Sequence, residues 1–119
     1  MEALRPTRLI TTTTFSVEGF QIVEYLGIVR GVVVRAPTIS QGFFGGLRTL
    51  VGGYIEAYTQ MCEQTRQHAT TQMMGHAREL GADAVIGIGY DASEIGQSAT
   101  EVLCFGTAVR LEPISEARR

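Results

Sequence analysis

The sequence predicts an α+β fold in which one long helix packs on a mostly antiparallel sheet. Between Tyr54 and Leu80, apolar residues recur at steps of three and four, which is the spacing of a helix stripe. The other apolar segments are rich in β-branched residues and are separated by turns that contain glycine. One layer of helix on one sheet is the simplest packing that buries both kinds of segment.

The N-terminal part of the chain predicts two strands. Leu9 to Phe15 is rich in threonine, which suits an edge strand, and a turn is expected at 17–19. Phe20 to Ala36 is apolar at both alternating sets of positions, so we expect both of its faces to be covered. A straight strand of this length would span over ~50 Å at ~3.3 Å per residue. Gly27 and Gly31 are therefore predicted to mark a bulge or bend.

Helical segments follow. Ser40 is expected to cap a short helix, which Gly45 and Gly46 weaken by about 1 kcal/mol each relative to alanine. The long helix should measure roughly 40 Å at ~1.5 Å per residue, and Gly81 should end it in the left-handed conformation. The stripe predicted to face the sheet consists of Ile55, Tyr58, Cys62, Thr65, Ala69, Met73, Ala77 and Leu80.

Two more strands complete the predicted sheet, Ala84–Tyr90 and Val102–Leu111, joined across Asp91–Ala99. We expect side chains to alternate regularly along the first of them. The last strand has one face of large residues and one of small residues. Leu103, Phe105, Thr107, Val109 and Leu111 form the heavy face, and Val102, Cys104, Gly106 and Ala108 form the light face. We expect the helix on one face of the sheet, and the light face to be left for another copy of the chain.

Length and composition bound the protein class. The 119 residues predict a single domain, 1–119, with loose termini at 1–8 and 112–119. A net charge of −2 gives no general attraction to nucleic acid or anionic lipid. With 45% hydrophobic residues and a mean hydropathy of +0.11, we expect apolar surface to be buried between copies. The sequence has no apolar run of ~18 residues and no apolar leader core, and its two cysteines are predicted to be free thiols in the cytoplasm.

The candidate metal ligands on the long helix are Cys62, His68 and His76. Helix geometry separates Cys62 from His76 by ~21 Å and His68 from His76 by ~12 Å. Zinc needs its ligands within about 2.0 to 2.3 Å, so no pair of these residues can chelate one ion within a single chain. Cys62 is predicted to be buried packing, His76 a hydrogen-bonded packing residue, and His68 a solvated or interface residue.

Other polar residues give weaker indications. Cys104 suits a free cysteine in an interface, with the alternative that its thiol contacts a ligand. Glycines within 42–53 could hold an anion at a helix start, although no phosphate-loop or dinucleotide motif is present. Glu24 beside Tyr25 would suit a general base if it were buried. Asp83 is expected to cap the turn at Gly81.

Four blocks of the sequence resemble a known family. They are Glu24–Val29, Phe43–Gly53, Glu79–Gly87 and Gly106–Val109. In this order they are similar to the YbjQ-like family of small bacterial and archaeal proteins, often labelled a heavy-metal-binding domain, and the resemblance spans roughly Phe15 to Arg110. It implies a dodecin-like subunit with one long helix, assembled into a homopentameric ring. Thr49 and Tyr54 depart from the family pattern, which usually has Asp and Arg at those positions.

Three functions remain open at this point. The first is a cytoplasmic ring that binds a small ligand or metal ion at subunit interfaces, with Glu24, Tyr25, Arg48 and Cys104 as candidate ligand-binding residues. The second is a structural scaffold without a ligand. The third is a remnant enzyme site around Arg48 and Glu24. The sequence identifies no cofactor, no particular metal and no catalytic residue, and the expected partner is another copy of the chain.

Overall fold

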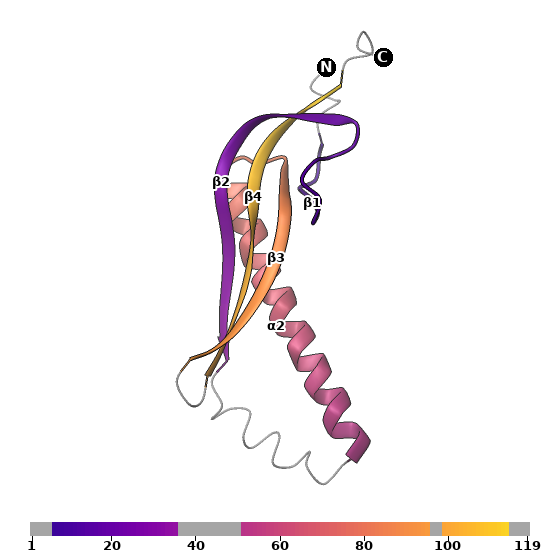
Figure 1. Cartoon of the computed structure of the whole chain (residues 1–119), viewed down its shortest axis with the longest axis vertical. Helices are drawn as coiled ribbons and strands as arrows, with labels where there is room; N and C mark the ends of the chain where they lie inside the picture. Colours follow the sequence, from indigo (N-terminus) through magenta and orange to yellow (C-terminus); the bar gives the residue numbers. More distant parts are fainter. Residues whose placement is uncertain (1–5, 36–50, 96–98, 115–119) are drawn as a thin grey trace.

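The computed structural model describes residues 6–35, 51–95 and 99–114, and it describes side chains in the helix from residue 59 onward. The described elements are β1 (Ile10–Thr11), β2 (Phe20–Arg35), α2 (Val51–Glu79), β3 (Ala84–Ile95) and β4 (Ala99–Pro113). The strands form one four-stranded sheet in the order β1-β3-β4-β2, and α2 crosses one face of it (Figure 1). The predicted α+β class is confirmed. The short helix predicted from Ser40 lies outside the described residues.

Strand β4 is the centre of the sheet. It pairs antiparallel with β2 and with β3, while β1 pairs parallel with the start of β3 at the sheet edge. Strand β3 runs past the predicted end at Tyr90 to Ile95, because its hairpin pairing with β4 continues through residues of low β propensity. Pro113 was expected outside the fold, in the C-terminal segment 112–119, but it is the last residue of β4 and lies opposite Phe20. Proline is tolerated there because β4 ends at this residue, so its missing N–H breaks no ladder inside the strand.

Glycines bend two of the strands. Gly27 has φ 119°, and the register of β2 shifts between Tyr25 and Gly27, as predicted. Gly31 is not a bulge, so that part of the prediction was wrong. Gly87 has φ 62°, and the register of β3 shifts between Ile86 and Gly89. This bulge interrupts the regular alternation that was predicted for β3.

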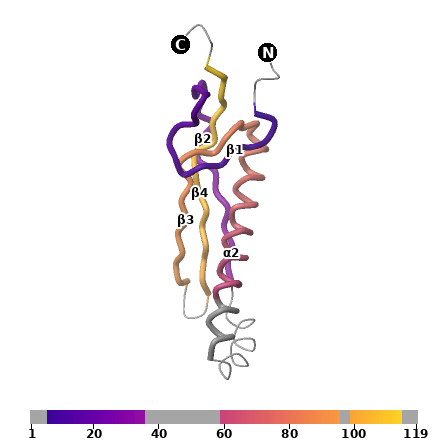
Figure 2. Tube along the Cα trace, turned by 90° about the vertical axis from the view of Figure 1, so that its right-hand side faces the viewer, coloured from indigo at the N-terminus to yellow at the C-terminus, as the bar shows by residue number. Residues whose placement is uncertain are grey.

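The main core lies between α2 and the light face of β4. Helix residues Ala69, Met73 and Ala77 are fully buried there, and Figure 2 shows α2 running alongside the strands. The expectation that the light face would be left for another copy was wrong. Small side chains on that face allow the helix to approach the sheet closely, so the chain covers it by itself. The core residues are Val29, Val33, Ala69, Met73, Ala77, Val85, Val102, Cys104 and Ala108.

The burial predicted for the helix stripe is confirmed in the middle of the helix and is wrong for Cys62 and Leu80 near its ends. Thr65, Ala69, Met73 and Ala77 are buried as expected. Cys62 is exposed, because Arg35, the last residue of β2, already contacts Thr65 through its Nε at 2.9 Å, and the helix beyond that point runs past the strand. The stripe positions 55 and 58 lie outside the described side chains.

The C-terminal end of the helix also departs from the predicted stripe. Leu80 is 42% exposed because it follows the last helical residue, Glu79, where the chain turns away. Gly81 has φ 79°, and its N–H bonds the Arg78 carbonyl at 3.0 Å, which confirms the predicted cap.

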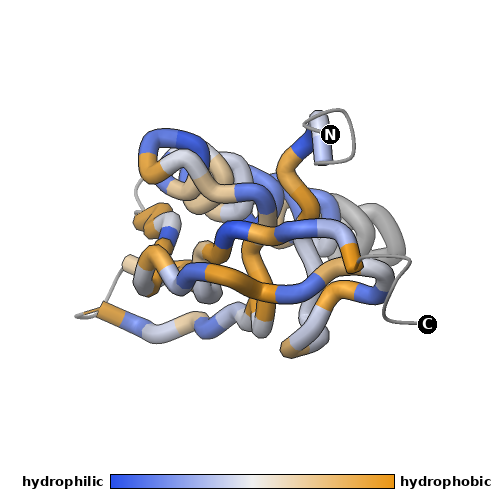
Figure 3. Tube along the Cα trace, turned by 90° about the horizontal axis from the view of Figure 1, so that it is seen from above, coloured by the Kyte–Doolittle hydropathy of each residue, from blue (hydrophilic) through white to orange (hydrophobic). Residues whose placement is uncertain are grey.

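A second, smaller core lies at the β1 end of the sheet. Ala84 and Ile86 of β3 pack with Val109 and Leu111 of β4, all nearly or fully buried. Partly buried residues of the N-terminal segment and the start of β2 close this core: Ile10, Val17, Phe20 and Ile22. Figure 3, coloured by hydropathy, shows apolar and hydrophilic residues interspersed along the chain.

Candidate functional site

A buried pair of sulfur atoms lies at the centre of the main core. Cys104 stands on β4 between Gly31 of β2 and Tyr90 of β3 in the sheet register. Its Sγ is 3.6 Å from Met73 Sδ on α2, and both side chains are 0% exposed. Cys104 is therefore covered by its own helix and does not lie at an exposed face, as had been expected. The two sulfur atoms fit between the helix and the sheet because their neighbours are small: Gly31 on β2 and Ala69 on α2.

Hydroxyl groups connect this sulfur pair to the surface. Thr70 Oγ1 lies 3.8 Å from Cys104 Sγ and 2.7 Å from the Tyr90 hydroxyl. Thr70 also donates to the carbonyl oxygen of Arg66 one turn earlier, at 2.9 Å. Tyr90 is half exposed, so the four atoms form a continuous chain from the core to solvent. We refer to Met73, Cys104, Thr70 and Tyr90 as the sulfur–hydroxyl cluster.

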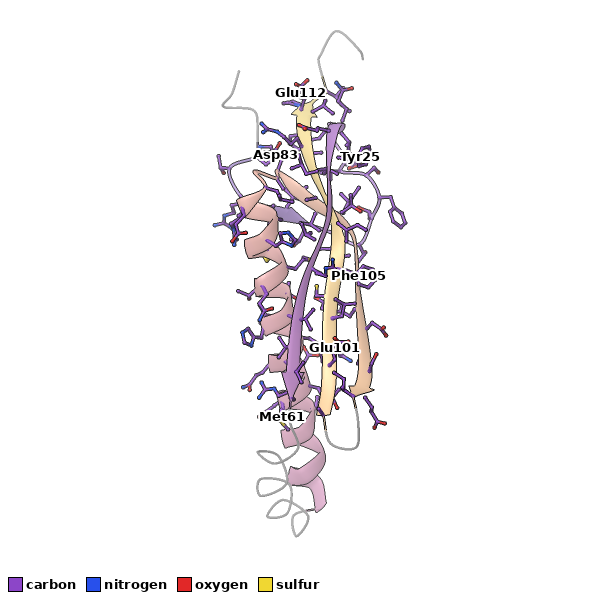
Figure 4. The ribbon with its side chains drawn as sticks, turned by 90° about the vertical axis from the view of Figure 1, so that its left-hand side faces the viewer. Tyr25, Met61, Asp83, Glu101, Phe105 and Glu112 are labelled. Atoms are coloured by element: carbon purple, nitrogen blue, oxygen red, sulfur yellow. The ribbon has the colours of Figure 1, made fainter. Side chains whose placement is uncertain are left out.

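A wide apolar surface lies on the side of the sheet that α2 does not cover. Alternate residues of β2 point away from the helix, and their register partners on β4 do the same. Ile28 is 70% exposed and Val34 is 55% exposed. Figure 4 shows Phe105 and Glu101 along β4 below Tyr25. We call this surface the outer face, and its members are Ile28, Arg30, Val32 and Val34 on β2, Glu101, Leu103 and Phe105 on β4, and Gly89 and Asp91 on β3.

The predicted pair Glu24 and Tyr25 lies at the irregular part of β2. Both side chains are exposed, between the two register shifts of this strand. Glu24 is opposite Arg110 and Tyr25 is opposite Val109. Among the described residues, nothing buries Glu24, so they do not form the buried general base that the sequence left open. Arg48, the other candidate of this site, lies outside the described residues.

The histidines and Cys62 do not converge. His76 Nδ1 accepts a long hydrogen bond, 3.5 Å, from the Arg30 N–H, which agrees with the predicted packing role. His68 and Cys62 are exposed on α2. Among the described residues, no three His, Cys, Asp or Glu side chains are grouped so that they could hold a metal ion. In the same part of the chain, no helix is long and apolar enough to span a membrane.

Asp83 has a structural role that the sequence did not indicate. Its Oδ2 accepts a hydrogen bond of 2.8 Å from the buried Leu111 N–H, and its own N–H bonds the Val109 carbonyl at 2.9 Å. The predicted capping of the Gly81 turn by Asp83 stays a prediction beside this role. The carboxylate satisfies a donor of β4 that lies beyond the first residue of β3, Ala84, which is paired with Val109.

Comparison with known families agrees with this architecture. The YbjQ_1 family, described as "Putative heavy-metal-binding", matches residues 9–112. The chain belongs to the YbjQ-like family. A UPF0145 protein of Legionella pneumophila (strain Corby) is 57% identical over 101 residues, covering 85% of this chain and 96% of that protein. A UPF0145 protein of Chromobacterium violaceum is 48% identical over 110 residues, covering 92% and 93%.

A solved structure shares the fold of this YbjQ-like chain. It is a protein of unknown function of the DUF74 family from Pediococcus pentosaceus, with a TM-score of 0.58 and 19% identity, covering 87% of this chain and 98% of that one. The family description names heavy metals. Zinc ligation by His, Cys and carboxylates does not fit the described part of one chain, because those groups do not converge. The soft donors Cys104 and Met73 do converge.

The sequence reasoning did not find the sulfur–hydroxyl cluster. Cys104 was singled out by itself, and Met73 was assigned to the helix stripe without reference to it. The missing information was the register of the β3–β4 hairpin, which places Tyr90 opposite Cys104. The spacing of Thr70 and Met73, one turn apart on α2, was the one signal in the sequence that could have pointed to a shared neighbour.

Proposed function

We propose that this YbjQ-like chain forms a homo-oligomer that binds a small ligand or a heavy-metal ion at contacts between its copies. The outer face is the observation that supports this proposal. It is a wide apolar sheet surface on which no described element of the chain packs. Exposed apolar surface of this extent is a typical sign of an association site in a small protein.

The charges of the outer face favour a second copy as its occupant. Arg30 lies opposite Phe105, while Asp91 lies opposite Leu103 in the next row of the same face. A cation and an anion therefore flank an apolar strip that includes Val32 and Leu103. A neighbouring copy matches both charges of this face, because it can place its Asp91 near Arg30. A strongly acidic partner would pair with Arg30 but repel Asp91, and a strongly basic partner would do the reverse.

Strand edges offer a second element of association. Backbone bonds from the N-terminal segment reach β3 as far as Ile88, whose N–H bonds the Thr12 carbonyl at 3.2 Å. Across the described residues, no strand of this chain pairs with the outer edge of β3 from Gly89 to Ile95. An unpaired edge of this length favours pairing with a neighbouring chain. Repeated contacts of one edge with a different edge close into a ring, and the family resemblance adds the number five.

The ligand site is proposed to need more than one copy. Glu24 and Tyr25 are exposed at the bulged part of β2, and Glu24 carries a carboxylate that can coordinate or hydrogen-bond a ligand. In the described region of one chain, Glu24 belongs to no group of three or more His, Cys, Asp or Glu side chains that could hold a metal ion. Donors from adjacent copies would complete the site, with Arg48 as a further candidate. A cytoplasmic location stays a prediction from the free cysteines.

A scaffold without a ligand is the second candidate. The predominantly apolar character of the outer face supports it, because a dry interface binds no polar molecule. The two candidates share the oligomer and differ in the ligand. Metal analysis of protein purified without an affinity tag distinguishes them. A stoichiometric metal that is lost on dissociation supports the binding protein, and a metal-free, ligand-free oligomer supports the scaffold.

Replacement of Ile28 by glutamate tests the association itself. Ile28 is largely exposed in one chain, so Ile28→Glu should change the stability of an isolated chain by no more than about 0.5 kcal/mol. In the oligomer it should place a charge in an apolar interface and dissociate it. Gln67→Glu, an exposed change of the same charge on α2, is the matched control. Sedimentation velocity should show dissociation for Ile28→Glu alone, whereas equal behaviour of the two variants would contradict the proposed interface.

A further inference from the structure

The sulfur–hydroxyl cluster combines features that ordinary core packing does not require. Two soft sulfur donors, from β4 and α2, lie 3.6 Å apart with no exposed surface. A thioether and a thiol are ligands that soft metal ions prefer over hard ones. The hydroxyls of Thr70 and Tyr90 extend from the thiol to the surface, with 2.7 Å between their oxygen atoms. The core thus contains a soft donor pair and a polar route that leads to it.

We propose that Cys104 and Met73 bind a soft monovalent cation of the Cu(I) or Ag(I) class within a single chain. Such ions accept low coordination numbers, so a thiolate and a thioether suffice as protein donors. With each sulfur about 2.3 Å from an ion, as for thiolate–metal bonds, two donors can lie at most ~4.6 Å apart. A two-coordinate ion of this class binds its donors in a line, so the two sulfurs, 3.6 Å apart in the structure, must separate by about 1 Å on binding. The flexible, unbranched Met73 side chain can supply this change without a large movement of α2 relative to β4.

The charge balance selects a monovalent ion. The site lies in a core of aliphatic and small side chains, where an uncompensated charge is costly. One thiolate and one monovalent cation form a neutral pair, and the thioether adds no charge. A divalent ion with the same donors would leave a net positive charge in the core. In the described region, Cys104 belongs to no group of three or more His, Cys, Asp or Glu side chains that could hold a divalent ion.

Binding exchanges a proton for the metal. The S–H bond of Cys104 breaks, a bond from Sγ to the ion forms, and Met73 Sδ donates a lone pair; no atom is oxidised or reduced. The released proton leaves by way of Thr70 and Tyr90 to solvent. Once the thiol proton is gone, the Thr70 hydroxyl can turn from the Arg66 carbonyl and donate to the bound sulfur, because its Oγ1 already lies 3.8 Å from Sγ. The Tyr90 hydroxyl can in turn donate to Thr70 at 2.7 Å.

This inference concerns a second site, separate from the one proposed between copies, since both of its donors belong to one chain and it does not depend on association. The two proposals therefore fail separately. Ile28→Glu should dissociate the oligomer and leave the sulfur site intact. A variant of Met73 should weaken ion binding and leave the oligomer intact.

Titration of the full chain with Ag(I) nitrate in chloride-free buffer tests the site. The other thiol is first removed by Cys62→Ser, a change at an exposed position. This parent protein should bind one Ag(I) per chain and release one proton per ion, measured by native mass spectrometry and by pH-stat titration. Zinc at the same concentration should not bind this site. Cys104→Ser in the same background should abolish the binding of Ag(I).

Met73→Leu is the decisive variant, because it removes the thioether and retains the volume of the side chain. Affinity for Ag(I), and for Cu(I) in competition with a chromogenic chelator, should fall by roughly tenfold or more, the scale at which loss of a supporting group at a metal site is felt. Unchanged affinity in Met73→Leu would overturn the proposal. So would Ag(I) binding that disappears with Cys62→Ser and persists in Cys104→Ser. Circular dichroism and sedimentation of each variant verify that fold and association are retained.

Discussion

Gly31 on β2 lies directly beneath the carbonyl oxygen of Ala69 on α2, so close that a Cβ at Gly31 would overlap that oxygen. The same Cβ would lie 2.8 Å from the Met73 backbone nitrogen. Backbone atoms cannot move aside as a flexible side chain can. This contact sets the distance between helix and sheet, and it explains why small residues line both sides of the core.

Gly31→Ala should therefore separate α2 from the sheet. Overpacking of a close contact lowers the unfolding free energy by about 1 to 3 kcal/mol. Because the new Cβ would meet backbone atoms of both Ala69 and Met73, we expect a loss of about 3 kcal/mol or more for Gly31→Ala. Gly75→Ala is the control, because its Cβ would meet no atom within 4 Å and alanine favours the helix by up to about 1 kcal/mol. Urea unfolding should move in opposite directions for the two variants. A shift in the same direction would show that the close contact is not rigid.

The free edge of β2 is covered by side chains of α2. Gln72 Oε1 accepts a hydrogen bond of 3.1 Å from the Val32 N–H, next to the bond from Arg30 to His76. Gln72→Ala should lower the unfolding free energy by about 1 kcal/mol through loss of this bond. Gln67→Ala, at an exposed helix position, should change it by less than about 0.5 kcal/mol. Denaturant melts that do not separate the two glutamine variants would speak against this role of Gln72.

Truncations along the helix stripe should follow the observed burial. Met73→Ala should cost about 2 to 5 kcal/mol, because it opens a cavity in a fully buried site. Leu80→Ala should cost about 1 kcal/mol or less, since Leu80 is only partly covered at the end of the helix. Thermal and urea unfolding of both variants measure the difference. Equal losses would mean that the helix end is packed more tightly than the structure shows.

Asp83 should be important for stability. Asp83→Ala leaves the Leu111 N–H without its acceptor in a position that is 1% exposed, at a cost of about 1 to 3 kcal/mol. Glu94→Ala removes a carboxylate from an exposed position of β3 and should be nearly neutral. The unfolding midpoint of each variant, compared with that of the parent chain, is the measurement. A neutral Asp83→Ala would show that water or another group replaces the carboxylate.

Local signals in the sequence predicted the elements well. The caps and bends at Gly27 and Gly81 follow from the freedom of glycine to adopt positive φ, which is a property of the residue itself. The middle of the helix stripe follows from periodicity. The ends of the stripe depend on where the sheet stops, which no local pattern specifies, and therefore Cys62 and Leu80 were misplaced.

The covered face of the sheet was the main error. Both faces of β4 are apolar, so hydrophobicity could not decide which one the helix would bury. The helix packs on the face of smaller residues because Gly31 and Ala69 let the backbones of β2 and α2 come into contact. Large side chains at these positions would hold the helix and the sheet apart. One consequence is that a charged substitution on the light face would damage the core, since Ala108 is 0% exposed within a single chain. A test of association therefore belongs on the outer face, where Ile28→Glu places the charge.

The candidate site was predicted in part. Cys104 was selected from the sequence, but its partners Met73, Thr70 and Tyr90 depend on the register of a hairpin and on the packing of α2 across it. Glu24 and Tyr25 were selected as neighbours in sequence and remain exposed neighbours in the structure. A site completed by other copies of the chain cannot be predicted from the pattern of one chain.

The mass of the unmodified chain in solution tests the central claim most directly. Sedimentation velocity at micromolar concentration, supported by native mass spectrometry, should give one closed species of several 12.9 kDa chains, five according to the family resemblance. A stable assembly of another number would retain the interface and correct the number of copies. A single species at the 12.9 kDa chain mass would show that the outer face is not an association surface and would contradict the account.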